Sequence, residues 1–259
     1  MSAARRRALW IAIFWAIVGG ASYVLAVQSE FGQRAEDSVL EAATFTTSPP
    51  PPLNLVSELT VGVALLLIAL VALARFGWRR ALAVAALPVA AIVASRLLKL
   101  QVLSRPELFE LDAPNTFPSG HMTAFVVLVG ALVWAVPAAI RAVTAVGGAV
   151  LLAVVGWQLL AFGWHRPSDV IGAVAVGVLV FALAALVSPP RTDGRAAFGR
   201  VISTVLVMSA WVLVAGALVL LGVAAIGGNS DLLLFAGQIG AFGASALASR
   251  ALFLLVEPR

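Results

Sequence analysis

Residues 169–188 read DVIGAVAVGVLVFALAALVS, a run that begins with one acidic residue and is otherwise almost entirely apolar. Roughly 20 apolar residues in a helix span the hydrocarbon core of a bilayer, which is about 30 Å thick. The apolar character is continuous rather than alternating, which favours a helix over a strand of a membrane barrel. This run therefore predicts an all-α membrane protein.

The composition of the whole chain supports the same fold class. Apolar residues make up 62% and charged residues 11% of the 259 residues, and the mean hydropathy is +1.05, far outside the range of soluble domains. We expect a polytopic helix bundle in a single membrane domain, residues 1–259, with a six-span core (8–188) and an extra C-terminal pair (201–256). The eight expected spans are 8–27, 55–75, 81–98, 120–136, 142–163, 169–188, 201–226 and 232–256.

The segments outside these spans are short, with one exception. The longest polar connection, 28–54, is expected to contain a short interfacial helix at 34–45 and a stiff polyproline spacer at Pro49–Pro52. The first span follows Arg5–Arg7, and its apolar part is longer than that of a signal peptide, so we interpret it as a retained anchor. The chain has no cysteine, which excludes disulfides and thiolate metal sites.

The positive charges predict the orientation in the membrane. The net charge is +5, yet the arginines are spread between spans and line no soluble face, so we expect no nucleic-acid partner. By the positive-inside rule both termini are cytoplasmic. The preference for arginine over lysine, together with abundant alanine and valine, indicates a GC-rich bacterial genome, and we expect the protein in the plasma membrane. The basic residues expected on the cytoplasmic side are Arg5, Arg6, Arg7, Arg75, Arg79, Arg80, Arg141, Arg191, Arg195, Arg200 and Arg259.

The opposite side holds three short polar stretches that contain the only lysine, Lys99, and both histidines, His121 and His165. If the eight spans alternate, all three stretches lie at the same membrane surface. We therefore expect residues up to 70 positions apart in the sequence to converge into one pocket at the external face.

The residue types in these stretches are suited to binding and transferring phosphate. Pro118-Ser119-Gly120-His121 resembles a helix start, where free backbone N–H groups bind anions and a glycine allows close approach. His165 and Asp169 are four residues apart, which predicts a carboxylate-oriented imidazole of the kind that acts as nucleophile or base. Lys99 and Arg105 supply the fixed positive charge that phosphoryl transfer requires.

The order of these three stretches resembles the motifs of the type 2 phosphatidic acid phosphatase superfamily, over roughly 81–188. The stretches are Lys99…Arg105-Pro106, Pro118-Ser119-Gly120-His121 and His165…Asp169. The resemblance implies six membrane helices and an extracytoplasmic active site that needs neither metal nor cofactor. The resemblance further implies that His165 attacks phosphorus, that Asp169 orients the His165 ring, and that His121 protonates the leaving group. The phosphate would be held by Lys99, Arg105 and the amides of Ser119 and Gly120.

Two departures from the family pattern bear on this resemblance. Five residues separate Lys99 from Arg105, where the family has six. The third motif begins with Gln158-Leu159 instead of Ser-Arg, so one phosphate-binding arginine is missing. We expect Arg166, beside the nucleophile, or Arg96 to replace it.

Together these patterns predict a membrane phosphatase that cleaves a phosphomonoester or pyrophosphate from a polyprenyl lipid or glycerolipid through a phosphohistidine; transfer to an alcohol acceptor is a close variant. The alternative is a non-catalytic lipid-phosphate binding or transport component, which the missing arginine favours. A histidine-ligated metal or haem protein is a weaker third interpretation, because the neighbouring cations oppose a bound cation.

Overall fold

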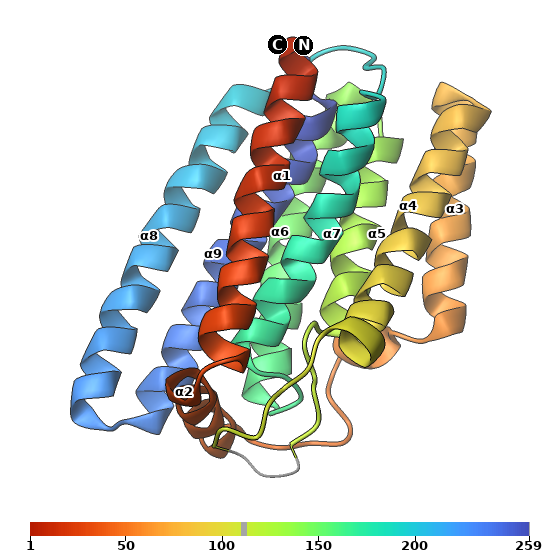
Figure 1. Ribbon diagram of the computed structural model, residues 1–259. Coiled ribbons are helices and arrows are strands. Elements are labelled where there is room, and N and C mark those ends of the chain that lie inside the picture. The colour runs from red at the N-terminus through yellow and green to blue at the C-terminus, as the bar shows by residue number, and fades with distance from the viewer. Residues whose placement is uncertain (110–112, 259) are drawn as a thin grey trace.

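The computed structural model describes residues 1–109 and 113–258, so Arg259 lies outside the described residues. In the described chain all regular structure is helical, which confirms the predicted fold class (Figure 1). Short π-helical turns extend α1 and α4, over Tyr23–Val27 and Leu98–Val102. The helices are α1 (Ala3–Ser22), α2 (Glu30–Glu41), α3 (Glu58–Phe76), α4 (Trp78–Leu97), α5 (Gly120–Ala135), α6 (Ala138–Ala161), α7 (Pro167–Val187), α8 (Gly199–Gly227) and α9 (Ser230–Val256).

Each of the eight expected spans coincides with one long helix. Seven of these helices, among the described residues, are long and apolar enough to cross a membrane. The remaining helix, α5, is shorter, with 16 residues, and most of its side chains are buried by neighbouring helices. The chain is thus a helical membrane protein.

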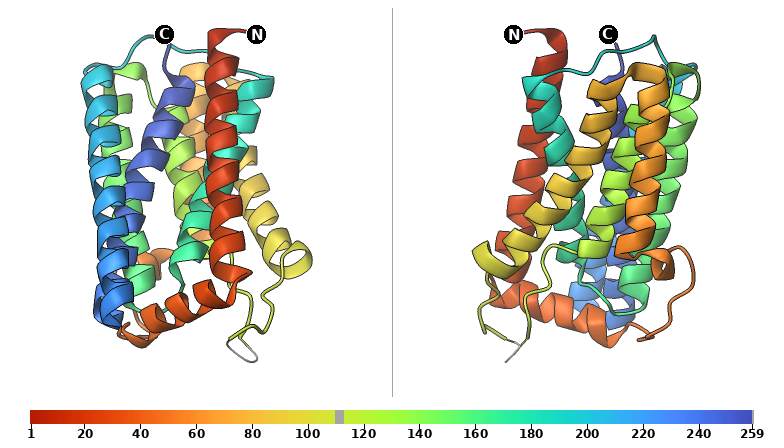
Figure 2. Two further views of the ribbon diagram at one scale, coloured as in Figure 1. Left: turned by 60° about the vertical axis from the view of Figure 1, so that its left-hand side comes forward. Right: turned by 90° about the vertical axis from the view of Figure 1, so that its right-hand side faces the viewer.

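The helices run up and down, with both termini at one end of the bundle, whereas α2 lies across the opposite end (Figures 1 and 2). Small residues permit close packing at the centre of the bundle. At Gly130 of α5, an added Cβ would lie 2.6 Å from the Phe181 ring of α7, and at Gly177 of α7 it would lie 2.4 Å from Val126. The start of α5 and the start of α7 are thereby fixed side by side.

The C-terminal pair is integrated unevenly into this bundle. α8 lies at the outside, whereas α9 packs against α5, α6 and α7 and is the most deeply buried of the candidate spans. The C-terminal helix therefore completes the interior that supports the other helices.

The connection 28–54 differs from its expected structure. Its helix, α2, covers Glu30–Glu41, so it begins and ends four residues earlier than expected. The proline run is not an extended spacer: Pro52 has helical backbone angles and leads into a 3₁₀ turn, Leu53–Leu55. The Gln158 side chain explains the difference, because its amide donates to the carbonyls of Pro50 and Pro51 and draws the run onto α6.

Candidate functional site

His165 and Asp169 form the hydrogen bond that their spacing predicts. α7 begins at Pro167, which places Asp169 in its first turn, and His165 Nδ1 lies 3.0 Å from Asp169 Oδ2. The same carboxylate oxygen accepts the Arg166 backbone N–H at 3.0 Å. Asp169 is 1% exposed. Since Nδ1 faces the carboxylate, Nε2 is the nitrogen of His165 left to meet a ligand.

The backbone before His165 is held by the end of α6. The carbonyl of Leu159 accepts the N–H groups of both Trp164 and His165, at 3.0 and 3.2 Å. The indole N–H of Trp164 donates to the carbonyl of Thr46 at 2.7 Å. The imidazole is therefore anchored through its main chain as well as its ring, a preorganisation that nucleophilic catalysis requires.

The structure brings His121 to the same place. His121 lies in the first turn of α5, and its ring centroid is 6.4 Å from that of His165 and 5.4 Å from the edge-on ring of Trp164. His121 is only half-buried. The two imidazole rings therefore lie beside one another at this end of the bundle.

Ser119 and Gly120 take different parts in the site. Ser119 Oγ accepts the Met122 N–H, and the Ser119 N–H donates to the Asp169 carbonyl at 3.0 Å, so Ser119 ties the start of α5 to the start of α7. The Ser119 amide, expected to hold phosphate, is thus already engaged. Gly120 is exposed, and no atom lies within 4 Å of the position of an added Cβ. The open side of this helix start is therefore at Gly120.

Of the predicted cations, Lys99 lies in the π-helical turn after α4, half-buried and within electrostatic range of Asp169 and His121. The side chain of Asn115, which the sequence did not single out, positions that turn. Its amide donates to the carbonyls of Lys99 and Leu103, and its oxygen accepts the Phe117 N–H.

The proposed replacements for the missing arginine differ in their surroundings. Arg166 is 7% exposed, and its Nη1 donates to Thr116 Oγ1 at 3.3 Å, beside the His165–Asp169 pair. Arg96 is exposed. Leu159, at the family's arginine position, is fully buried. Burial beside the histidine favours Arg166 as the compensating cation.

Arg105 lies next to a carboxylate that sequence reasoning missed. Its Nη1 is 3.6 Å from Oε2 of Glu36 in α2, and both side chains are buried. Oε1 of Glu36 accepts the N–H of Ser168, the neighbour of Asp169, at 2.9 Å. Burial and the charge of Asp169 raise the pKa of Glu36 despite these contacts. Nothing in the local sequence signals this placement, because it depends on how α2 docks.

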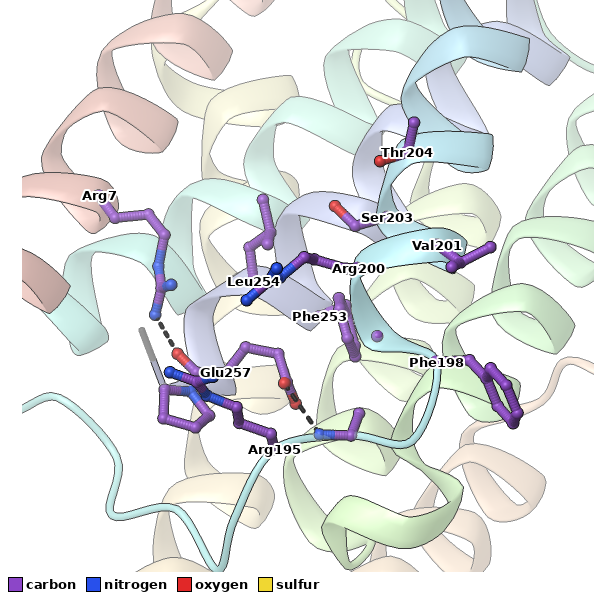
Figure 3. A pocket seen from close by; sticks show the side chains of 13 residues that line it. Arg7, Arg195, Phe198, Arg200, Val201, Ser203, Thr204, Phe253, Leu254 and Glu257 are labelled. Carbon is purple, nitrogen blue, oxygen red and sulfur yellow. Dashed lines mark hydrogen bonds between the residues drawn. The ribbon is translucent and has the colours of Figure 1, made fainter.

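A separate pocket of about 430 Å³ lies at the other end of the bundle, where the termini are (Figure 3). It is lined by Arg7 of α1, by α8 and the loop before it, and by the end of α9 and the residues just after it, including Glu257. None of the predicted site residues lines it. The Glu257 carboxylate there is engaged by Arg141 at 2.9 Å and by the Ala196 N–H. This end of the bundle is thus separate from the histidine site.

The structure is that of a helical membrane protein in which the two histidines, His121 and His165, lie together at one end of the bundle. The family model of the PAP2 superfamily matches residues 101–193, which confirms the resemblance seen in the motifs. The matched segment contains Arg105, His121, His165 and Asp169, and Lys99 lies just before it. No curated protein and no solved structure matches the chain significantly.

Proposed function

We propose that this protein is a membrane lipid phosphatase that hydrolyses a phosphomonoester or pyrophosphate of a polyprenyl lipid or glycerolipid. The observation that carries the proposal is the pairing of a carboxylate-bound imidazole, His165, with a second imidazole, His121, whose ring centroid is 6.4 Å away. A protein that only binds phosphate has no need of this combination.

In the first step, Nε2 of His165 attacks phosphorus, and the bond from phosphorus to the lipid oxygen breaks. The departing oxygen takes a proton from His121, while Asp169 stabilises the positive charge that develops on His165. Lys99, Arg105 and Arg166 balance the charge of the phosphate oxygens, with the Gly120 amide at the helix start.

In the second step, water attacks the phosphohistidine, and His121 accepts its proton. The bond between nitrogen and phosphorus breaks, so His165 is regenerated and inorganic phosphate leaves. An alcohol in place of water would make the protein a lipid phosphotransferase by the same chemistry.

The distribution of basic residues supports an orientation for this reaction. Most arginines lie in or beside the helix ends at the end of the bundle where the termini lie, whereas His121 and His165 lie at or just before the starts of α5 and α7, at the other end (Figure 1). With the basic end cytoplasmic, the site opens at the external face of a plasma membrane, where a lipid head group is within reach.

The test is phosphate release from short-chain phosphatidic acid and polyprenyl pyrophosphate by the detergent-solubilised protein, in the presence of a chelator. We expect chelator-resistant release that His165→Ala abolishes. The buried Leu159 in place of an arginine favours the second candidate, a lipid-phosphate binder. Binding without release would establish that candidate instead, and release that the chelator abolishes would indicate a metal mechanism.

A further inference from the structure

The helix α2 presents two buried polar side chains, Gln33 and Glu36, to the loop that carries Arg105. Gln33 holds the backbone of that loop, because its amide donates to the Pro106 carbonyl at 2.7 Å and its oxygen accepts the Phe109 N–H. Glu36, one turn further on, faces the guanidinium of Arg105 itself. The position of the Arg105 loop is therefore maintained by Gln33 without the charge of Glu36.

The carboxylate of Glu36 is incompletely compensated. Oε1 accepts one hydrogen bond, from the Ser168 N–H, whereas Oε2 is buried without a hydrogen bond to any described residue and lies 3.6 Å from Arg105 Nη1. Burial and the nearby charge of Asp169 raise the pKa of Glu36. The buried carboxyl group of Glu36 thus lies between the backbone of Ser168, the neighbour of Asp169, and the guanidinium of Arg105.

We propose that Glu36 is an internal anion that competes with phosphate for Arg105 and so weakens the affinity of the site for substrate and product. This inference rests on the proposed function, in which Arg105 holds the phosphate. A phosphate group that approaches Arg105 meets the charge of Glu36 and must replace its contact. The consequence is faster release of inorganic phosphate, at the expense of a higher KM.

The competing explanation is that Glu36 only positions Arg105, and the two explanations predict effects of opposite sign. Glu36→Gln keeps the shape and the acceptor for Ser168 but removes the charge. If Glu36 competes, the variant binds inorganic phosphate about tenfold more tightly, the scale of one charge-assisted hydrogen bond. If Glu36 merely positions Arg105, the variant binds phosphate equally well or more weakly.

The experiment titrates the purified full-length protein in detergent with inorganic phosphate by calorimetry. The matched control is Glu41→Gln, an exposed position on the same helix, for which we expect the wild-type Kd. Should Glu36→Gln not fold, Glu36→Ala carries the same expectation. An unchanged or weaker Kd, or no detectable phosphate binding by either protein, overturns the inference.

Turnover of short-chain phosphatidic acid, measured on the same samples, separates this inference from the proposed function. We expect Glu36→Gln to lower KM about tenfold without raising kcat. Tighter phosphate binding with no turnover in any variant would retain the inference and refute the phosphatase. Turnover in the wild type with an unchanged phosphate Kd in Glu36→Gln would support the phosphatase and refute the inference about Glu36.

Discussion

Asp169→Asn is the substitution that tests the proposed mechanism most directly. The carboxylate oxygen Oδ2 accepts two hydrogen bonds, from His165 Nδ1 and from the Arg166 N–H, both at 3.0 Å. The asparagine oxygen is able to keep both contacts, so the geometry is preserved and the negative charge is lost. The variant therefore isolates the electrostatic role of Asp169.

The size of the effect follows from which of the two bonds strengthens during the reaction. Positive charge develops on His165 as it attacks, whereas the Arg166 amide stays neutral. A hydrogen bond to a charged partner contributes about 1.5–3 kcal/mol, and about 1.4 kcal/mol corresponds to a factor of ten. We expect kcat to fall about 10- to 150-fold with little change in KM, because the lost interaction forms mainly in the transition state.

The assay is steady-state phosphate release from dioctanoyl-phosphatidic acid in detergent micelles, with His165→Ala as the background. Asp231→Asn is the matched control: it makes the same chemical change at an exposed aspartate in the first turn of α9, where we expect wild-type kinetics. Thermal melting of each variant verifies folding. If folded Asp169→Asn keeps a kcat within threefold of wild type, or changes KM alone, the assigned role of Asp169 is wrong.

Three further predictions concern stability and packing. Burial and a neighbouring carboxylate raise the pKa of Glu36 above its ordinary value of 4.5, so its contribution to stability is present below pH 4.5 and is lost as the pH rises through the raised pKa. Between pH 4.5 and the raised pKa, Glu36→Gln should therefore make the melting temperature depend less on pH. An unchanged slope of melting temperature against pH would contradict this. Arg141→Ala removes a 1%-exposed arginine that pairs with the buried Glu257 at 2.9 Å and with the partly exposed Asp193 at 2.7 Å. Because the Glu257 charge would be left buried without its partner, melting should show a loss of about 3 kcal/mol with unchanged kcat; wild-type stability would show that these pairs contribute nothing. Gly172→Ala places a Cβ 2.3 Å from the Phe117 ring. We expect this overlap to lower the free energy of unfolding by about 1–3 kcal/mol and to lower kcat, because it displaces the start of α5. Normal melting and turnover would refute the packing argument.

The fold class and the order of the membrane-spanning segments are properties that the sequence determines locally. Apolar length sets which segments span a bilayer, and alternation then places the starts of α5 and α7 at one surface. The convergence of His121 and His165 follows from that parity, since both lie at these helix starts. The His165–Asp169 bond also follows locally, because four residues at a helix start bring the two side chains together.

The tertiary structure decided the lateral order of the helices and the contacts between residues of different helices. Hydropathy is nearly uniform around these helices, so no apolar stripe in the sequence indicates the lateral order, and α9 takes an interior place. The docking of α2 likewise brings Glu36 to Arg105 across 69 residues of sequence, and the closeness of α5 and α7 engages the Ser119 amide. Such contacts arise from shape and buried hydrogen bonding between distant segments, which neither composition nor spacing encodes.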